Sequence, residues 1–405
     1  MGGGPAGACL GVLLAKQGCK TAIFHSDKRP PLIVGESLLP AVIPFLRKLG
    51  IEEEVKSFSV YKPGATICLN LKEVITAPFT FAEGKLPDYA YNAPRDLFDQ
   101  AILNAAERAG AAIFRMTAKL EKGDEPDTVR LSEETLSRTG GFFDKQPDVI
   151  VDASGRNRVI SKLLDHPVTE GGRNDVALFA HLENATLNDA GHIHLDYLTK
   201  GWSWRIPLPG KVSVGVVINP SHLEQYGDGI EKQYDAYIRD EPSLKFYCEG
   251  STRVSPVLKY NNYQLISGRM YGPGWILVGD SAGFVDPVFS PGLYLGLKGA
   301  FDACETLSAG SARALEKYQN ERQREFKYWQ RVVDTWYNGK LFNLYRAGQK
   351  YNKNAIGAKM EHRVRKRLAR ILTGEAASDR LTMWLFDSLI SLGVALRDPA
   401  DLVVV

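Results

Sequence analysis

Apolar residues in the first third of the chain recur alternately at helical and at strand spacing. A helix is predicted from Ala8 to Gln17, ended by Gly18, and a strand follows over residues 20–24. A second helix is predicted to begin at Arg95, and it is again followed by a strand, over residues 111–115. Helices and strands that alternate in this way are typical of β-α-β units with a parallel sheet.

The pattern changes after residue 176. Apolar runs over residues 177–180, 192–195 and 212–218 follow one another with no helical spacing between them, which predicts an antiparallel sheet. An apolar strand over residues 275–280 and a helix over residues 292–309 then return to the first pattern, and the spacing after them is helical.

These patterns predict an α/β fold with α+β elements, in which a Rossmann-like nucleotide-binding domain is interleaved with an antiparallel-sheet substrate domain. The nucleotide-binding domain is expected to take residues 1–175, with inserted strands, and to resume over residues 266–310. The sheet domain takes residues 176–265, and a C-terminal helical region takes residues 311–405. A chain of 405 residues is long enough for two such interlocked units.

The first segment, GGGPAG, matches G-x-G-x-x-G with glycines at Gly2, Gly4 and Gly7, and Pro5 and Ala6 belong to this candidate cofactor-binding turn. A pyrophosphate needs backbone without Cβ atoms and free N–H groups at a helix N-terminus, which this arrangement supplies. The helix and strand that follow favour dinucleotide binding, and a glycine turn that binds nothing is the alternative.

Two positions depart from the dinucleotide pattern. A strand is expected before the first glycine, where the sequence has only Met1, so we expect the chain to lack that strand or to obtain it otherwise. The acidic residue that usually ends the second strand is replaced by His25, and Asp27 is a candidate substitute that we do not assign.

Composition excludes several classes of function. The net charge of +3 is too small to indicate a nucleic-acid partner, and no apolar run is long enough to span a bilayer. The five cysteines show neither C-x-x-C nor metal-ligand spacing, so we expect no metal site, and free thiols in a reducing, cytoplasmic compartment.

Some residues allow two interpretations from pattern alone. Lys62 enters a predicted strand, where a lysine is usually a solvated edge residue. Trp202 and Trp204 point to one face of a strand and form either sheet core or a wall. The basic run over residues 363–370 either docks an acidic carrier protein or is a solvated helix face. Four aromatic residues either line a substrate pocket or belong to the core: Trp336, Tyr337, Phe342 and Tyr345.

Three motifs together resemble those of FAD-dependent aromatic hydroxylases and their relatives. Gly279 and Asp280 close a strand before a glycine turn, where an aspartate suits the ribityl chain of a flavin. The segments 152–155 (DASG) and 95–99 (RDLFD), the latter beginning with Arg95, resemble the companion motifs. The resemblance implies that the nucleotide-binding domain is an FAD-binding domain.

A further segment, GWSWRIP over residues 201–207, resembles the W-x-W-x-I-P signature of flavin-dependent halogenases. In that family, a wall formed here by Trp202, Trp204 and Pro207 keeps the organic substrate away from the flavin, so that a small anion reacts instead. Lys62 lies in YKPGAT and resembles the family's essential lysine, and GESLLP over residues 35–40, with Ser37, resembles the strap beside the flavin.

The segment DPVFSPGL over residues 286–293 resembles the halogenase loop next to the flavin ring, with Ser290, Gly292 and Leu293 near halide and flavin. Members acting on free tryptophan have a glutamate before the serine, where this chain has Phe289, so the chain is more similar to members acting on phenols, pyrroles or carrier-tethered rings. Pro291 has no N–H, which removes one donor to the halide at a cost of about 1–3 kcal/mol.

The resemblance therefore implies an FAD-dependent oxidoreductase of secondary metabolism, a halogenase using reduced FAD, O2 and chloride or bromide. Hypohalous acid passes to Lys62 and then to an electron-rich aromatic ring, a phenol or pyrrole, free or on an acyl or peptidyl carrier protein. No second G-x-G-x-x-G is present, so a separate flavin reductase is the expected partner. The alternative is an FAD-dependent monooxygenase that oxidises an organic substrate directly, which Pro291 favours.

Overall fold

The computed structural model of the protein describes residues 1–26, 30, 32–261, 264–343, 346, 355–375 and 402–404. Two short parallel strand pairs form the nucleotide-binding region, one made by β1 (Ala22–Phe24) with β6 (Ala112–Phe114) and one by β9 (Ile150–Asp152) with β19 (Trp275–Leu277). The strand β18 (Tyr271–Gly272) adds to the second pair. Four helices flank these strands: α1 (Pro5–Lys16), α4 (Arg95–Arg108), α9 (Pro291–Ala309) and α10 (Ala312–Tyr337).

A groove of about 820 Å³ lies between β1 and β9, lined by both strands and by α1 and α9 residues such as Leu14 and Leu307. Met1 closes one end of it. The Met1 ammonium donates to the Val151 carbonyl at 2.7 Å, and Gly2 N–H donates to the Phe24 carbonyl at 2.9 Å.

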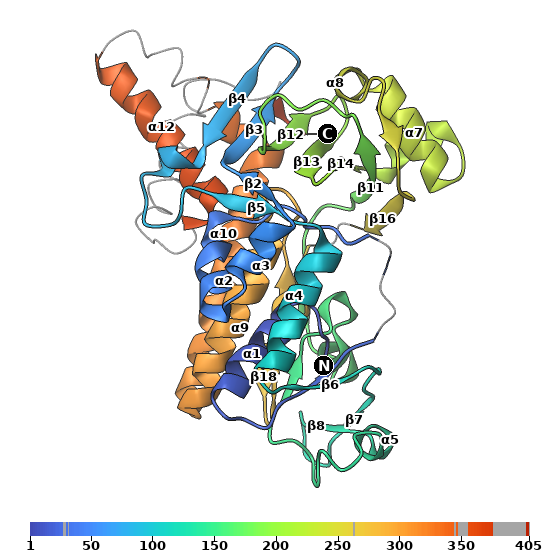
Figure 1. The fold of residues 1–405 in the computed structure, drawn as a ribbon, viewed down its shortest axis with the longest axis vertical. Helices are drawn as coiled ribbons and strands as arrows, with labels where there is room; N and C mark the ends of the chain where they lie inside the picture. Colours follow the sequence, from blue (N-terminus) through green and yellow to red (C-terminus); the bar gives the residue numbers. More distant parts are fainter. Residues whose placement is uncertain are drawn as a thin grey trace.

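An eight-stranded sheet forms the second region (Figure 1), and its strands follow the order β15-β11-β14-β13-β12-β3-β4, with β16 paired to β11. The predicted antiparallel sheet therefore exists, but it also takes two strands from residues 64–78, and β3 runs parallel to β12. Its strands are β3 (Gly64–Cys68), β4 (Val74–Pro78), β11 (Val176–Glu183), β12 (Ile193–Tyr197), β13 (Trp202–Leu208), β14 (Lys211–Ile218), β15 (Thr252–Arg253) and β16 (Leu258–Asn261).

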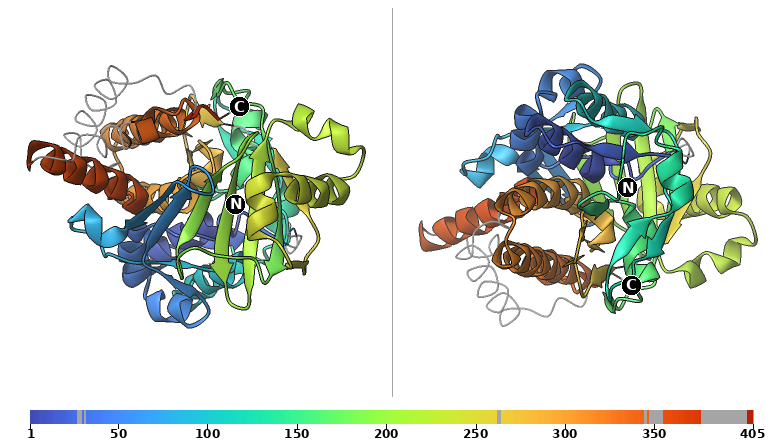
Figure 2. Two further views of the ribbon diagram at one scale, coloured as in Figure 1. Left: turned by 90° about the horizontal axis from the view of Figure 1, so that it is seen from above. Right: turned by 90° about the horizontal axis from the view of Figure 1, so that it is seen from below.

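The two faces of this sheet have different partners because side chains alternate along each strand. Leu178 of β11 and Val214 of β14 pack with Tyr234 and Leu244 under the outer helices α7 (Ile230–Asp240) and α8 (Pro242–Tyr247). The adjacent residue of β11, Phe179, lies on the opposite face of the sheet and belongs to the main core. Figure 2 shows α7 and α8 on one flank of the molecule and the helices α9 and α10, side by side, on the other.

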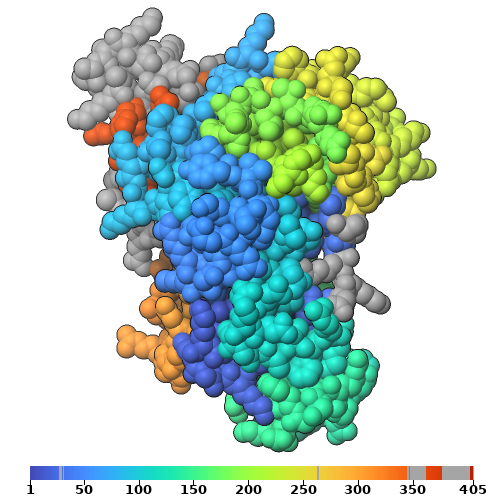
Figure 3. All heavy atoms as spheres, in the orientation of Figure 1, coloured from blue at the N-terminus to red at the C-terminus, as the bar shows by residue number. Residues whose placement is uncertain are grey.

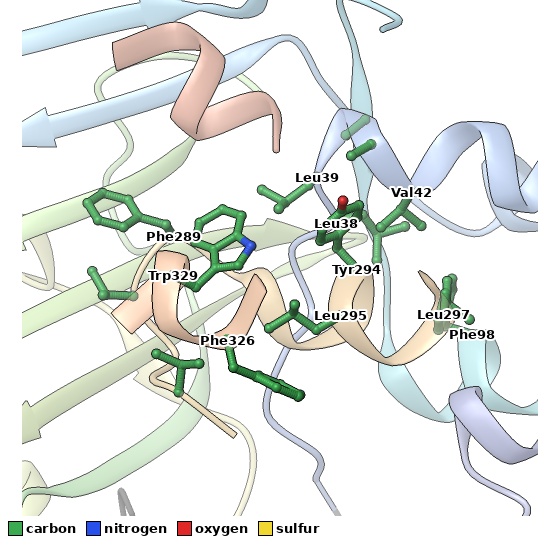
Figure 4. Close-up of a cluster of buried hydrophobic side chains, with 14 of the residues drawn as sticks. Leu38, Leu39, Val42, Phe98, Phe289, Tyr294, Leu295, Leu297, Phe326 and Trp329 are labelled. Carbon is green, nitrogen blue, oxygen red and sulfur yellow. The ribbon is translucent and has the colours of Figure 1, made fainter. Parts of the chain in front are cut away.

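The segment of residues 35–40, the strap, joins the two regions. It pairs with β5 (Ala90–Asn92), since Leu38 N–H donates to the Tyr91 carbonyl at 2.9 Å, and β5 pairs in turn with β2 (Val60–Lys62). Residues of α2 (Ile43–Leu49), α3 (Glu52–Ser57) and α4, blue to cyan, cover the middle of the face in Figure 3. Figure 4 shows apolar side chains of the strap, of the turn before α2, and of α4, α9 and α10 in one cluster: Leu38, Leu39, Val42, Phe98, Tyr294, Leu295, Leu297, Phe326 and Trp329.

Smaller elements complete the described parts of the chain. Residues 120–137 form a hairpin followed by a short helix, and α12 packs against the turn over Phe79–Ala82. The remaining bounds are β7 (Leu120–Lys122), β8 (Val129–Leu131), α5 (Glu133–Ser137), α6 (Val159–Leu163), β10 (Val168–Glu170), β17 (Leu265–Ser267), β20 (Gly283–Phe284) and α12 (Ala355–Thr373). No helix among these described segments is long and apolar enough to cross a bilayer.

Candidate active site

A cleft of about 420 Å³ lies at the N-terminus of α1, between the nucleotide-binding strands and the large sheet. It brings together most of the predicted site residues from six separate segments. The predicted residues that line it are Gly4, Pro5, Ala6, Ser37, Arg95, Trp202, Trp204, Gly279, Asp280, Ser290, Gly292 and Leu293.

The glycine motif shapes one end of the cleft. Gly2 has φ +101°, and a Cβ there would lie 2.1 Å from the Ala153 carbonyl oxygen. A Cβ at Gly7 would lie 2.0 Å from the Gly2 carbonyl oxygen, so Gly2 and Gly7 shape the turn without lining the cleft. A Cβ at Gly4 would meet no protein atom within 4 Å, so this position leaves open space in front of the α1 N–H groups.

Polar side chains around the cleft fit the remainder of FAD. The Arg95 guanidinium is paired with Asp99 at 2.9 Å and also donates to the Val34 carbonyl, so it is fixed at the strap. Burial raises the pKa of Asp280, an effect that the nearby Arg156 and Arg95 oppose. The buried Ser37 hydroxyl has no partner among the residues that the structure describes. A carboxylate for ribityl hydroxyls, a free hydroxyl at the strap and free helix N–H groups together match a flavin dinucleotide.

The helix α9 begins at the opposite end of the cleft. Ser290 is its N-cap in the left-handed region, with φ 57°, and Phe289 has φ 63°, which costs non-glycine residues about 1–2 kcal/mol each. Pro291 occupies the first helical position, where a missing N–H is tolerated best, and it does not line this cleft. Gly292 and Leu293 do, so two N–H groups of the first turn are available at the positive end of a long helix.

Trp202 and Trp204 form a continuous wall on β13. Their ring centroids are 5.9 Å apart and both indoles are buried, which agrees with the alternation predicted for residues two apart. The third member of the wall is Ile206. The prediction of Pro207 in the wall was wrong, because Pro207 is one residue out of step and does not line the cleft.

Lys62 lies on β2 and is 1% exposed, so the solvated-edge interpretation is wrong. Its ammonium donates to the Leu38 carbonyl at 2.8 Å and lies 5.3 Å from the centre of the Phe79 ring. Burial lowers the pKa of Lys62 from 10.5 to about 7. Lys62 does not belong to the described lining of the cleft, whereas Ser37, which precedes Leu38 in the strap, does.

Several contributors to the site carry no motif that the sequence analysis used. Ile193 and Leu195 of β12 extend the apolar wall, and the strand alternation could have indicated them. The buried His181 ring contacts the Glu36 carboxylate at 2.8 Å and ties the strap to β11. These residues are 145 positions apart, so no local pattern could reveal the pair.

The basic run belongs to α12 and is largely engaged with the body of the protein. Lys366 pairs with Glu83 at 2.5 Å, Arg370 donates to the Ala82 carbonyl at 3.1 Å, and the Arg365 guanidinium lies 4.4 Å from the centre of the Phe81 ring. Docking of a carrier protein at this run stays a prediction. Of the four aromatic residues, Tyr345 lies outside the described residues, and the other three are buried.

The fold and the cleft define a flavin-dependent oxidoreductase, in which a nucleotide-binding unit faces an apolar sheet wall. The chain belongs to the tryptophan halogenase family, whose model matches residues 58–397. Members of this family are FAD-dependent halogenases.

Individual relatives agree with this membership. The chain is 29% identical over 355 residues to a tryptophan 2-halogenase of Chondromyces crocatus, covering 83% of this chain and 67% of the relative. It is 25% identical over 375 residues to a 1H-pyrrole-2-carbonyl-[peptidyl-carrier protein] chlorinase of Pseudomonas fluorescens, covering 83% and 82%. The chain spans 66% and 64% of two flavin-dependent halogenases of Armillaria mellea.

Solved structures show the same fold. The flavin-dependent brominase Bmp2 superimposes with a TM-score of 0.77 over 98% of both chains, at 21% identity. The myxobacterial chondrochloren halogenase CndH, described as a variant of FAD-dependent halogenases, has a TM-score of 0.73 at 26% identity, covering 92% of this chain and 95% of that one.

Proposed function

We propose that the protein is a flavin-dependent halogenase that uses reduced FAD, O2 and chloride or bromide to halogenate an electron-rich aromatic ring. The observation that carries this proposal is the Lys62 amine. It is buried, its pKa is about 7, and it lies outside the described lining of the flavin cleft. An amine with this pKa is partly neutral, and therefore nucleophilic, near pH 7.

Bound reduced FAD supplies the electrons with which O2 and halide form hypohalous acid and water. Gly292 and Leu293 hold the halide through N–H groups at the positive end of α9. Trp202, Trp204 and Ile206 close the cleft to a ring-sized molecule, so the halide is the species that reacts there. Arg95, Asp280 and the glycine turn orient the dinucleotide.

Lys62 then binds or reacts with the electrophile, hypohalous acid. The neutral amine either hydrogen-bonds hypohalous acid or reacts with it, forming an N–halogen bond and releasing water. Attack by the aromatic ring transfers the halogen to carbon and returns the amine with the proton that the ring carbon loses. Lowering of the Lys62 pKa by burial favours this chemistry, because the ammonium form has no lone pair.

The substrate that we propose is a phenol or pyrrole, free or tethered to a carrier protein. The support is Phe289, an apolar residue packed against Trp336 where the tryptophan-directed members of the family carry a glutamate. The pyrrole relative named above acts on a carrier-bound ring. A separate flavin reductase supplies reduced FAD, because the sequence has no second dinucleotide motif.

The experiment compares wild type with Lys62→Met, given reduced FAD, O2 and bromide and a panel of free and carrier-bound phenols and pyrroles. The halogenated product, measured by mass spectrometry, should disappear while flavin oxidation continues at the wild-type rate. Lys56→Met, at an exposed lysine of α3, is the matched control and should keep full product formation. Unchanged halogenation by Lys62→Met would contradict the role of Lys62.

Direct monooxygenation is the second candidate, and Pro291 is the observation that favours it. The first turn of α9 has one halide donor fewer than a helix with any other residue there. The same mass spectra separate the two functions, because a monooxygenase adds one oxygen atom, whereas a halogenase replaces hydrogen by halogen.

A further inference from the structure

The last two residues of α10 each connect the tryptophan wall to the loop that precedes α9. Tyr337 accepts a hydrogen bond from the Trp202 indole N–H at 2.9 Å and donates one to the Asp286 carboxylate at 3.2 Å. Trp336 packs edge-on against Trp202 and against Phe289, with ring centroids 5.9 and 5.4 Å apart. The sequence left both residues as either pocket lining or core.

The loop at the other end of these contacts is under backbone strain. Phe289 and Ser290 are consecutive non-glycine residues in the left-handed region, a conformation that persists where the surroundings enforce it. Asp286 is 1% exposed and accepts the Val288 N–H at 2.9 Å, and the Phe289 ring is buried against Trp336. The contacts from α10 are therefore part of what holds Ser290 at the start of α9.

The Tyr337 hydroxyl is held between one hydrogen-bond donor, the Trp202 indole, and one acceptor, the Asp286 carboxylate. Burial, together with the charge of Asp286, keeps the pKa of Tyr337 well above its ordinary value, so the hydroxyl keeps its proton and donates to the carboxylate. The Arg173 guanidinium lies 3.8 Å from the centre of the Tyr337 ring, and Arg173 is held by Asp175 at 2.6 Å. A paired cation therefore covers one face of the Tyr337 ring.

We infer that Tyr337 is a positioning residue that couples the Trp202 wall to the loop of residues 286–290, so that closure of the cleft and placement of the halide-binding helix end are set together. Trp202, Asp286 and Ser290 all line the cleft, whereas Tyr337 acts on it through two of them. The role in turnover rests on the proposed function, but the mechanical coupling does not.

The first test is hydrogen exchange of the FAD-free protein with Tyr337→Phe, which keeps the ring and removes both hydrogen bonds. Exchange in the peptides covering 286–290 and β13 should both accelerate, by about five- to tenfold, which corresponds to the loss of one buried hydrogen bond. Tyr318→Phe is the matched control, because its hydroxyl donates to the Leu277 carbonyl at 2.7 Å from the same helix. It should leave both peptides at the wild-type rate. Unchanged exchange in Tyr337→Phe, or equal changes in both variants, would overturn the inference.

The second test measures coupling in turnover with reduced FAD, O2 and bromide. Tyr337→Phe should release severalfold more hydrogen peroxide per flavin oxidised, with the Kd for oxidised FAD within about twofold of wild type. Trp202→Phe removes the same hydrogen bond from its other end, so the double variant should release little more peroxide than either single one. Additive effects would overturn the coupling. A wild type that makes no halogenated product would contradict the proposed function and leave the exchange result intact.

Discussion

The burial of Lys62 makes a quantitative prediction about stability. A pKa lowered from 10.5 to about 7 means that the folded protein carries a cost for the ammonium form. At about 1.4 kcal/mol per pH unit, this cost is roughly 5 kcal/mol below pH 7. Between the folded and unfolded pKa values the unfolded chain binds more protons, so the stability of the wild type rises with pH across that window.

Lys62→Met keeps the side-chain length and removes the titrating group. The variant loses the hydrogen bond to the Leu38 carbonyl, a pH-independent cost of about 1–3 kcal/mol. The difference in unfolding free energy, variant minus wild type, should therefore fall by about 2 kcal/mol between roughly pH 7 and 9.

Urea unfolding of the FAD-free proteins at several pH values measures this difference, and for Lys56→Met the difference should not change with pH. If the difference for Lys62→Met did not change with pH either, the Lys62 amine would titrate as in water, which would refute the reasoning from burial.

Three further predictions concern the cofactor cradle, the groove and the sheet. Gly4→Ala should leave the free energy of unfolding unchanged, because its Cβ meets no protein atom within 4 Å. It should nevertheless weaken FAD binding about tenfold or more in a flavin-fluorescence titration. Equal affinity would exclude close phosphate approach at Gly4. An extension of five alternating valines and threonines before Met1 should stabilise the protein by about 2 kcal/mol or more through pairing with β1 and β9 in the groove. An extension of prolines and aspartates is the control and should not stabilise the protein. Equal melting temperatures of the two extended proteins in calorimetry would contradict strand pairing in the groove. Arg205→Met leaves the fully buried Asp196 carboxylate without its partner at 2.7 Å and should cost about 3–5 kcal/mol in urea unfolding, whereas exposed Arg239→Met should cost almost nothing.

Local patterns predicted the parts of the site whose geometry depends on neighbouring residues. The glycine spacing predicted the turn before α1, because a Cβ atom at Gly2 or at Gly7 would collide with a backbone carbonyl oxygen. The spacing of Trp202 and Trp204 predicted one wall, because strand side chains alternate with a period of two. The same rule, applied to Pro207, would have excluded it from the wall.

Long-range packing decided the rest. Alternation along β2 could not show that Lys62 is buried, because the Leu38 carbonyl and the Phe79 ring that cover its amine come from other segments. Likewise, the sequence left Trp336 and Tyr337 as either pocket lining or core, because the partners of Tyr337, Trp202 and Asp286, lie 135 and 51 positions away. A sequence determines which face a side chain takes on its own element, whereas its partner depends on where the whole chain places the other elements.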